Sequence, residues 1–338
     1  MTEPSPTSPS CMLVTGAAGF LGRHVVATLR QEGHKVRALV HPDEDVAPLQ
    51  SHEDVALVEA DLLTADDLAG AFDGVDVLIH LAAQMTGPDD QVYASAVDGS
   101  QRLLEAMAQS ATRRLVLMSS FSAYDWSRVT GQVTEDTPVL DEAGTAGLDA
   151  YARAKTAQEH LVRQISGANG WDLTVLRAPV IWGPSRLMVW EVGNKLGPFM
   201  CVVAPGADVR LSYVEHCAEA IVAAATKPAA VGQTFNVTDG FTVSRWRYAQ
   251  QVMRPGGIGG VCVPVPYWAG LLIAHLAWAI AAIMPGARSR LPGLLVPQRY
   301  RARFKAASAA NDHLRNTLGW RPRLSFEQAV HSAVASHG

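Results

Sequence analysis

Short, nearly continuous apolar runs alternate with longer stretches of helical periodicity through the first half of the chain. The apolar runs predict strands over Cys11–Thr15, Lys35–Val40, Val55–Ala60, Val75–Leu81, Arg114–Ser119 and Asp172–Arg177. The longer stretches predict helices over Leu21–Gln31, Val92–Gln109 and Ala150–Gln164. Strands without polar alternation are typical of a parallel sheet buried on both faces. The order of elements therefore predicts an α/β fold, a doubly wound parallel sheet with helices on both sides.

The regular pattern weakens after about Gly183, where proline and glycine become frequent. Two more helices are predicted near the C-terminus, over Asn311–Leu318 and Phe326–Ala335. We expect a disordered tail over 1–10, a sheet domain over 11–183 completed by segments near 208–240, and a smaller lobe over 184–338. Such a lobe would pack at the carboxyl edge of the sheet, where folds of this class bind ligands in a crevice.

The composition is that of a globular protein. The 338 residues are 48% apolar and 18% charged, and 28 Lys and Arg against 32 Asp and Glu give a net charge of −4. This mild acidity gives no electrostatic reason to expect a nucleic-acid partner. The four cysteines (Cys11, Cys201, Cys217 and Cys262) are scattered, so neither a disulfide framework nor a metal site is predicted. A cytoplasmic location is expected, because the N-terminus MTEPSPTSPS lacks the apolar stretch of a secretory signal.

One apolar segment raises the question of a membrane. Tyr267–Met284 contains one histidine and no formal charge, and its 18 residues lie at the lower edge of transmembrane length. Three interpretations stay open: a helix that roofs the substrate pocket, a peripheral helix at a membrane surface, or a span. Basic residues that could meet anionic lipid follow it: Arg288, Arg290, Arg299, Arg301, Arg303 and Lys305. A span would place the C-terminal segment on the far side of the bilayer from the sheet.

The first predicted strand runs into the glycine-rich stretch TGAAGFLG at 15–22, and a predicted helix follows. Glycine is needed where a backbone turns tightly and must approach a pyrophosphate closely. The N-terminus of the helix then offers N–H groups and the positive end of its dipole to phosphates. The position of this stretch between a strand and a helix predicts a dinucleotide site.

Two further motifs carry chemistry. Tyr151 and Lys155 are one turn apart on a predicted helix and therefore share a face. A lysine ammonium beside a phenol is expected to lower the tyrosine pKa and allow proton exchange with a carbonyl or hydroxyl group. Ser119 and Ser120 end a buried strand at the sheet edge where this helix should begin. A serine hydroxyl there could donate to a substrate oxygen.

Together these motifs resemble an extended short-chain dehydrogenase/reductase of the NAD-dependent epimerase/dehydratase superfamily. The matching pieces, in family order, are TGAAGFLG at 15–22, Asp61 after the third strand, DVLIHLAA at 76–83, AVDGSQRLLEAM at 96–107, SS at 119–120, YARAK at 151–155, VLRAPVIWGP at 175–184 and LGWRPRLSFEQAV at 318–330. The resemblance implies a Rossmann domain followed by a substrate-binding lobe, and helices of this fold commonly form a homodimer in relatives.

The resemblance also implies a role for each matching residue. Ser120, Tyr151 and Lys155 fall on the catalytic triad, and Ser120 is preferred to Ser119 because it lies four residues before Tyr124. The cofactor would contact Gly16, Gly19, Phe20, Leu21 and Gly22 at the pyrophosphate, Asp61 and Leu62 at the adenine, Ala82 and Ala83 at the adenosine ribose, and Pro179 and Ile181 at the nicotinamide. Tyr151 and Lys155 would contact the cofactor as well, because the lysine also holds the nicotinamide ribose.

Two positions depart from the family pattern. Ala96 stands where relatives often have an asparagine that supports a proton relay. The second predicted strand ends at Val40, where an NAD site usually has an acid for the ribose 2′-hydroxyl. His41 follows, at a position where NADP-using relatives often have arginine. The sequence therefore favours NADP over NAD, and Arg37 could assist if its side chain points the same way.

The stretch Arg177-Ala-Pro179 is similar to the dihydroflavonol reductase and 3β-hydroxysteroid dehydrogenase branches, which act on apolar alcohols and ketones. The leading hypothesis is an NAD(P)-dependent oxidoreductase that transfers hydride between nicotinamide and a secondary alcohol or ketone on a fairly apolar small molecule. A nucleotide-sugar epimerase with tightly bound NAD is one alternative. A non-catalytic nucleotide sensor or structural subunit is the other.

Overall fold

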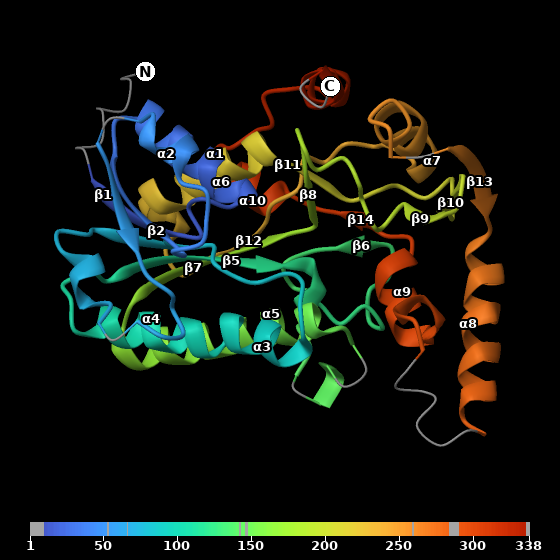
Figure 1. Ribbon diagram of the computed structural model, residues 1–338, viewed down its shortest axis with the longest axis horizontal. Helices are drawn as coiled ribbons and strands as arrows, with labels where there is room; N and C mark the ends of the chain where they lie inside the picture. Colours follow the sequence, from blue (N-terminus) through green and yellow to red (C-terminus); the bar gives the residue numbers. More distant parts are fainter. Residues whose placement is uncertain are drawn as a thin grey trace.

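The computed structural model describes residues 10–52, 54–65, 67–141, 143–145, 148–258, 260–283 and 291–335. The tail predicted over 1–10 lies, except for Ser10, outside the described residues. The long axis of the molecule runs from the central sheet to a smaller lobe (Figure 1).

The centre of the fold is a parallel sheet of seven strands in the order β12-β7-β5-β4-β1-β2-β3. The strands are β1 (Cys11–Thr15), β2 (Lys35–Val40), β3 (Val55–Glu59), β4 (Val77–His80), β5 (Arg114–Ser120), β7 (Asp172–Ala178) and β12 (Thr234–Asn236). The predicted α/β class is confirmed. The strand order reverses between β1 and β4, and a sheet of this kind opens a ligand crevice at that point.

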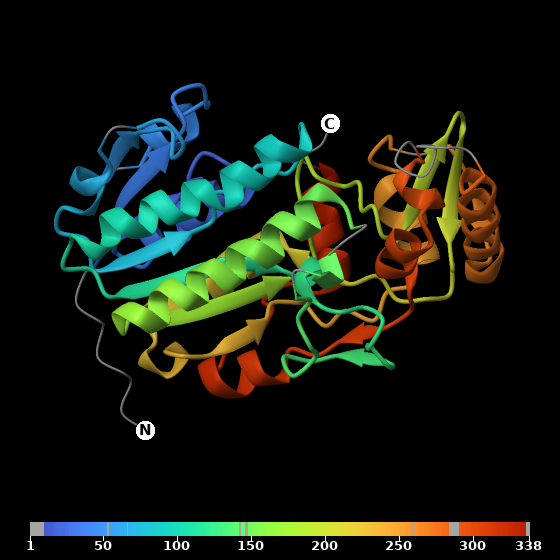
Figure 2. The same ribbon diagram turned by 90° about the horizontal axis from the view of Figure 1, so that it is seen from below.

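Helices cover both faces of the sheet (Figure 2). Helices α1 (Phe20–Gln31) and α6 (Val214–Thr226) pack on one face, and α3 (Asp89–Ala96), α4 (Asp98–Ala108) and α5 (Ala150–Asn169) pack on the other. Within β1, Met12 and Val14 enter the first of these cores and Leu13 the second, as the two-residue period of a strand requires. The single helix predicted over 92–109 is two helices, because the backbone at Val97 (φ −95°, ψ −60°) breaks it.

The smaller lobe is built on the three-stranded sheet β13-β10-β9. Its elements are β9 (Gly193–Leu196), β10 (Phe199–Val203), α7 (Arg245–Tyr248), the π-helical η5 (Ala249–Met253), β13 (Val261–Val265), α8 (Tyr267–Ala281), η7 (Gly293–Leu295), α9 (Pro297–Phe304) and α11 (Phe326–Ala335). An aromatic cluster of Trp182, Tyr213, Tyr248 and Phe326 fills the core between this sheet and the central one.

Short elements connect the two parts. The pairs are β8 (Val180–Trp182) with β11 (Leu211–Tyr213) and β6 (Gln132–Val133) with β14 (Ser308–Ala309), and the remaining short helices are α2 (Ala47–Gln50), η1 (Ala69–Phe72), η2 (Phe121–Ala123), η3 (Ala143–Thr145) and η4 (Pro228–Ala230). The chain also returns to the first part, because Leu314 and Leu318 of α10 (Asp312–Leu318) and Trp320 lie in the core of the central sheet. The boundary at 183 stays a prediction, and part of the segment predicted as lobe packs on this sheet.

The apolar segment forms helix α8 over Tyr267–Ala281, and Met284 lies outside the described residues. Its interpretation as a roof over the pocket is wrong, since no described residue of α8 lines the cavity discussed below, and α8 packs on η7 and α9, which do line it. Among the described residues, every helix is too short or too polar to cross a bilayer.

Candidate active site

One cavity of about 1960 Å³ lies between the carboxyl ends of the sheet strands and the lobe. It is larger than the roughly 300–1,000 Å³ of a typical single-ligand pocket, so it has room for a dinucleotide and a substrate together. The structure brings all fifteen residues of the predicted site to this cavity: Gly16, Gly19, Phe20, Leu21, Gly22, His41, Asp61, Leu62, Ala82, Ala83, Ser120, Tyr151, Lys155, Pro179 and Ile181. Their individual roles remain predictions.

The glycine turn at the end of β1 has the close backbone packing that its sequence suggests. Gly16 has φ +65°, in the left-handed region that favours glycine. A Cβ on Gly22 would lie 2.1 Å from the carbonyl oxygen of Gly16, so only glycine fits. Helix α1 begins at Phe20, and in this part of the described chain no side chain caps its N-terminus and no acid lies in its first turn. These N–H groups are therefore open to an anion.

The end of the cavity beyond β2 is rich in carboxylates. The Leu63 N–H and the Thr64 hydroxyl donate to Asp61, and the Leu63 bond is the main cause that lowers the pKa of this carboxyl. The backbone N–H of His41 donates to Oε2 of Glu44 at 3.0 Å, and Glu44 also lines the cavity. Sequence reasoning missed Glu44, because it lies four residues beyond the strand end and only the turn brings it back.

His41 has carboxylates on two further sides. Its Nδ1 lies 3.6 Å from Oδ2 of Asp43, and its Nε2 lies 3.9 Å from Oδ2 of Asp61. Arg37 points away from the cavity, since its guanidinium donates to the carbonyl oxygens of Gly70 and Ala71 on η1. The expected assistance from Arg37 is therefore absent.

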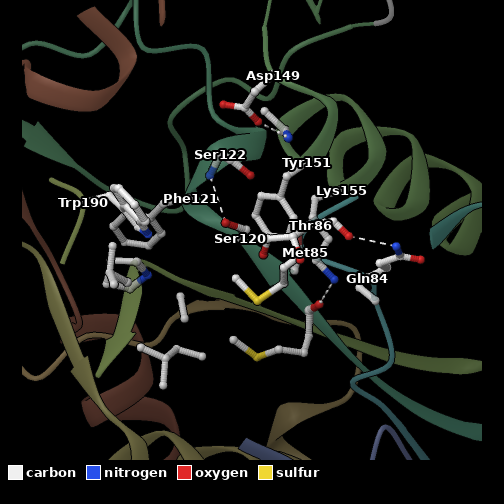
Figure 3. A pocket seen from close by; sticks show the side chains of 18 of the residues that line it. Gln84, Met85, Thr86, Ser120, Phe121, Ser122, Asp149, Tyr151, Lys155 and Trp190 are labelled. Atoms are coloured by element: carbon white, nitrogen blue, oxygen red, sulfur yellow. Dashed lines mark hydrogen bonds between the residues drawn. The ribbon is translucent and has the colours of Figure 1, made fainter. Parts of the chain in front are cut away.

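Tyr151 enters the cavity from the first turn of α5. Asp149 starts this helix, because its carboxylate accepts the N–H of Ala152 at 2.8 Å. Ser120, at the end of β5, lies beside the tyrosine ring, and its hydroxyl oxygen accepts the N–H of Ser122 at 3.2 Å (Figure 3). A helix cap and a strand end thus bring the two hydroxyl groups to one place.

The two adjacent serines have different surroundings. The Ser119 hydroxyl donates to Oε2 of Glu159 at 2.5 Å. Glu159 also accepts from Arg177 (Nη2 to Oε1 at 2.5 Å) and Arg163, and all but Arg163 are buried. Burial alone would raise the pKa of Glu159, but the hydrogen bond and charge of Arg177 lower it to about 2. The Ser119 hydroxyl is therefore bound to a buried ion pair. Ser120 is the serine whose hydroxyl is available in the cavity.

Lys155 is held by the sheet as well as by its own helix. Its Nζ donates to the Met118 carbonyl oxygen and to Oε1 of Gln158, both at 2.7 Å. Burial lowers the pKa of Lys155 to about 8, and the charge of Glu159 opposes this shift. The amine is still mainly protonated at pH 7, and it lies near Tyr151 in the cavity wall (Figure 3).

The expected effect of Lys155 on Tyr151 is corrected by the structure. Burial raises the pKa of Tyr151, and the hydrogen bond with Ser120 is the first influence that lowers it. Lysine does not act here because its ammonium is directed to Met118 and Gln158. The serine therefore does more than orient a substrate oxygen, since it also favours the phenolate.

A buried polar chain that sequence reasoning missed leads away from Lys155. Gln158 Nε2 donates to the Ser100 hydroxyl at 2.8 Å, which lies 2.8 Å from Nε2 of His80, and Nδ1 of His80 lies 2.7 Å from the Thr15 hydroxyl. Burial lowers the pKa of His80 to about 3, so the imidazole is neutral at pH 7. The chain ties the lysine to the strand that precedes the glycine turn. Gln158 was detectable, because it lies one helical turn after the lysine.

Ala96, where relatives often have asparagine, is buried and does not line the cavity. Its carbonyl oxygen accepts the hydroxyl of Ser100. The Ala96 backbone therefore joins the polar chain beneath Lys155, while its methyl group packs with Val92 and Ala154 and supplies no amide.

The lobe side of the cavity combines apolar and cationic side chains. Trp190 extends into the cavity from the lobe, on the same side of Tyr151 as Phe121 of η2 (Figure 3). Arg210 lies over the Trp126 ring, 4.1 Å from its centroid, and its guanidinium pairs with Glu191 at 2.8 Å. The remaining arginines of this wall are Arg186, Arg299, Arg301 and Arg303.

The glycine turn, the Ser-Tyr-Lys group and the strand order all belong to one stretch of the chain. A sequence model of the NAD dependent epimerase/dehydratase family matches residues 12–238. The chain belongs to this family. It is an NAD(P)-dependent enzyme of the extended short-chain dehydrogenase/reductase type, an oxidoreductase or an epimerase.

Proteins similar to this chain include both oxidoreductases and epimerases. The chain is 27% identical to a 3-beta-hydroxysteroid dehydrogenase of Mycolicibacterium neoaurum, over 94% of this chain and 89% of that protein. It is 26% identical to a 4-hydroxy-2-methyl-3-oxo-4-farnesyl-3,4-dihydroquinoline-1-oxide ketoreductase of Stigmatella aurantiaca, over 94% and 93%. The UDP-glucuronic acid 4-epimerase from Bacillus cereus, solved in complex with NAD, shares the fold with a TM-score of 0.71 at 18% identity, over 97% and 96%.

A dinucleotide fits the residues present. The absence of a Cβ on Gly22 lets the start of α1 pack closely on the turn, and the uncapped N–H groups of this helix lie at the cavity. Pro179 and Ile181 follow β7 on the other side of the cavity, next to the edge where Tyr151 and Ser120 meet. The family's cofactor would therefore lie across the carboxyl ends of β1, β4 and β5.

Proposed function

We propose that the enzyme oxidises or reduces a secondary alcohol or ketone on a fairly apolar small molecule. One observation carries this proposal: the hydroxyl groups of Tyr151 and Ser120 and the amine of Lys155 line the same cavity as the glycine turn. The names of the two relatives that align over nearly the whole chain, a steroid dehydrogenase and a ketoreductase, support the apolar substrate class.

When bound, the nicotinamide gives or takes the hydride at the carbinol carbon. Tyr151 Oη exchanges the hydroxyl proton with the substrate oxygen, and Ser120 Oγ donates a hydrogen bond to that oxygen. Burial of the phenol opposes its ionisation, and the hydrogen bond with Ser120 is the first influence that favours the phenolate. Lys155, whose Nζ is held by Met118 and Gln158, would bind the nicotinamide ribose.

The test of this role compares Tyr151→Phe with the wild type. The substitution removes the oxygen that exchanges the proton and keeps the ring. Turnover should fall by about 10²–10⁴-fold, while the dissociation constant of the cofactor, measured by fluorescence titration, changes little. Tyr93→Phe on the outer side of α3 is the matched control and should keep full activity. A Tyr151→Phe enzyme with wild-type turnover would falsify the role.

We further propose that the cofactor is NAD, although the sequence by itself favoured NADP. The support comes from the surroundings of His41: carboxylates of Asp43, Glu44 and Asp61 lie around it, and Arg37 is engaged on η1. A 2′-phosphate would add about two negative charges beside these groups. A ribose 2′-hydroxyl could instead donate to a carboxylate.

Glu44→Gln tests this preference. Removing one carboxylate should raise kcat/KM for NADP relative to NAD by about tenfold. This is the effect expected when one repulsion between a carboxylate and the 2′-phosphate is removed at a partly exposed site. Glu105→Gln, an exposed change on α4, is the control. A wild-type enzyme that prefers NADP, or a ratio unchanged by Glu44→Gln, contradicts the proposal.

A nucleotide-sugar epimerase is the second candidate, and the cationic lobe wall favours it. Arg186, Arg299 and Arg301 line the cavity on the substrate side, where they could bind a diphosphate. An epimerase would retain stoichiometric NAD through purification and release no net reduced cofactor. An oxidoreductase that acts on a steroid-like substrate would not have to retain NAD through purification, and it would release net reduced cofactor.

A further inference from the structure

Helix α8 leaves one apolar face uncovered at the end of the molecule farthest from β3 (Figures 1 and 2). Trp268, Leu272, Leu276 and Ile280 recur every four residues and so share one side of the helix. Each of these side chains is between 52% and 68% exposed. The opposite side packs on the lobe, where Ala274 is fully buried. A continuous row of large apolar side chains that stays exposed, although the other side of the helix is buried in the lobe, indicates a surface that contacts another molecule.

The lobe sheet carries three more exposed apolar side chains. Val203 and Val265 are paired across β10 and β13 and lie in the cluster beneath α8 and α9. Four residues earlier on each strand, and therefore on the same side of the sheet, Phe199 pairs with Val261. Leu196 of β9 pairs with Phe199 and completes the row. Together Leu196, Phe199, Val261, Trp268, Leu272, Leu276 and Ile280, which we call the end surface, are all exposed.

The segments that carry the end surface contain no acidic residue. Positions 192–207 and 240–311 have neither Asp nor Glu, but they include ten Lys and Arg residues: Lys195, Arg245, Arg247, Arg254, Arg288, Arg290, Arg299, Arg301, Arg303 and Lys305. The rest of the chain then has 28 − 10 = 18 basic and 32 acidic residues, a net charge of −14. The net charge of −4 is therefore unevenly distributed: these segments of the lobe are basic, and the rest of the chain, which we call the acidic body, is acidic.

Exposed basic side chains lie on the same lobe as the apolar ones. Lys195 precedes Leu196 on β9, is exposed, and lies on the other face of the sheet. Arg254 is exposed and acts electrostatically on Cys262 of β13. Arg301 Nη2 lies 3.0 Å from Nε2 of His275 on α8. An apolar surface edged by cations matches the chemistry of an anionic lipid headgroup region.

We propose that the end surface docks on an anionic lipid membrane, with α8 lying in the plane of the interface. The helix has 15 residues and a length of roughly 22 Å, shorter than the ~30 Å hydrocarbon core, so it lies along the surface and does not cross it. A second copy of the chain is a poorer occupant. Two end surfaces in contact would bring two sets of basic segments that contain no acid, positions 192–207 and 240–311, against each other.

Flotation of the purified full-length protein on lipid vesicles tests the proposal. We expect binding to vesicles of phosphatidylcholine with about one-third phosphatidylserine, and at least about tenfold weaker binding to phosphatidylcholine alone. The triple variant Leu272→Gln/Leu276→Gln/Ile280→Gln should lose binding by more than about tenfold, since each change removes a buried aliphatic contact with lipid. Tyr93→Gln, an exposed apolar site on α3, is the matched control and should bind as wild type.

A charge variant provides an independent reading. Lys195→Glu/Arg254→Glu should weaken binding to anionic vesicles by at least about tenfold, because each basic residue near the surface contributes roughly 1 kcal/mol. Arg23→Glu/Lys35→Glu makes the same change of charge on the acidic body and should have little effect. Thermal unfolding of each variant at the wild-type temperature confirms that all of them fold.

Two outcomes overturn the proposal. One is a wild-type protein that stays unbound on anionic vesicles at about 0.1 M salt. The other is a concentration-dependent dimer that the triple variant dissociates while neither protein binds vesicles, which would assign the end surface to a second copy. Equal loss of binding in the charge variant and its control also contradicts the role of the basic segments.

Discussion

The two walls of the cavity are built in different ways. On the sheet wall, every predicted site residue is set by a regular element: a strand end, a glycine turn or the capped start of α5. On the lobe wall, η7, α9 and the stretch 185–191 contribute side chains from short elements, and Trp190 is 60% exposed. Rigid backbone fixes the chemistry, and shorter, more exposed segments face the substrate. The comparison suggests that the reaction depends on the first wall and the choice of substrate on the second.

The largest expected effect lies beneath the sheet wall. Glu159→Gln leaves the buried Arg177 without its carboxylate partner, and breaking such a pair costs about 3–5 kcal/mol. We expect the free energy of unfolding, measured by urea titration, to fall by this amount. Glu105→Gln on the exposed side of α4 should change it by less than about 0.5 kcal/mol. Equal stability of the two variants would show that the ion pair does not hold this wall.

The sheet wall should also make the fold sensitive to acid. The pKa of Glu159 is about 2 in the folded chain, below its usual ~4.3, so its contribution is present above about pH 4.3 and is lost as the pH falls towards 2. The pKa of His80 is about 3, so between about pH 6.5 and 3 the unfolded chain binds a proton that the folded chain does not. Both groups lower stability as the pH falls.

Urea titrations between pH 7 and 4 measure this slope. His80→Asn should flatten it between about pH 6.5 and 4.5, where Glu159 contributes little. The matched control His331→Asn, at an exposed position of α11, should retain the wild-type slope. An unchanged slope in His80→Asn would mean that the imidazole is protonated in the folded chain.

A smaller effect is expected at the glycine turn. Gly22→Ala places a methyl group against the Gly16 carbonyl, so the turn must shift and the dissociation constant of the cofactor should rise by about tenfold or more. At Gly206 an added Cβ meets open space, and Gly206→Ala should leave cofactor binding unchanged. Fluorescence titration with NAD compares the two variants. Equal affinities would argue against the turn as the pyrophosphate site.

The smallest effect is expected on the lobe wall. Trp190→Ala should raise KM for an apolar substrate several-fold, because it removes an aromatic contact beside Tyr151, and should leave the cofactor affinity unchanged. Trp268→Ala, on α8 and away from the cavity, should change neither value. A loss of cofactor affinity in Trp190→Ala would erase the distinction between the two walls.

Local patterns were sufficient for the sheet and its motif positions. The predicted bounds of β1 and β2 agree with the structure, because each strand consists mostly of buried apolar residues and is followed by a turn or a polar residue. The break at Val97 was missed, since no proline or glycine marks it. Glu44 was missed because only a turn brings it back to the cavity. The exposure of α8 was not predicted, because the sequence of an apolar helix is similar whether the helix is buried in a core or faces a membrane.

The lobe wall could not be predicted for a physical reason. Its residues come from segments far apart in the sequence, such as Trp126 and Arg210, whose contact depends on tertiary packing alone. The sheet wall needs only the rule that parallel strands end at one edge. The direction of Lys155 likewise depends in part on the Met118 carbonyl oxygen, which no spacing rule ties to the lysine, whereas Gln158 lies one helical turn after it.

The fate of a labelled hydride tests the central proposal most directly. The enzyme is incubated with NAD and a steroid-like secondary alcohol that carries deuterium on the carbinol carbon, and the products are examined by mass spectrometry. The account predicts one equivalent of deuterated NADH for each ketone formed, and neither product with Tyr151→Phe. Deuterium that stays in an inverted alcohol, with no free NADH, would contradict it and identify an epimerase.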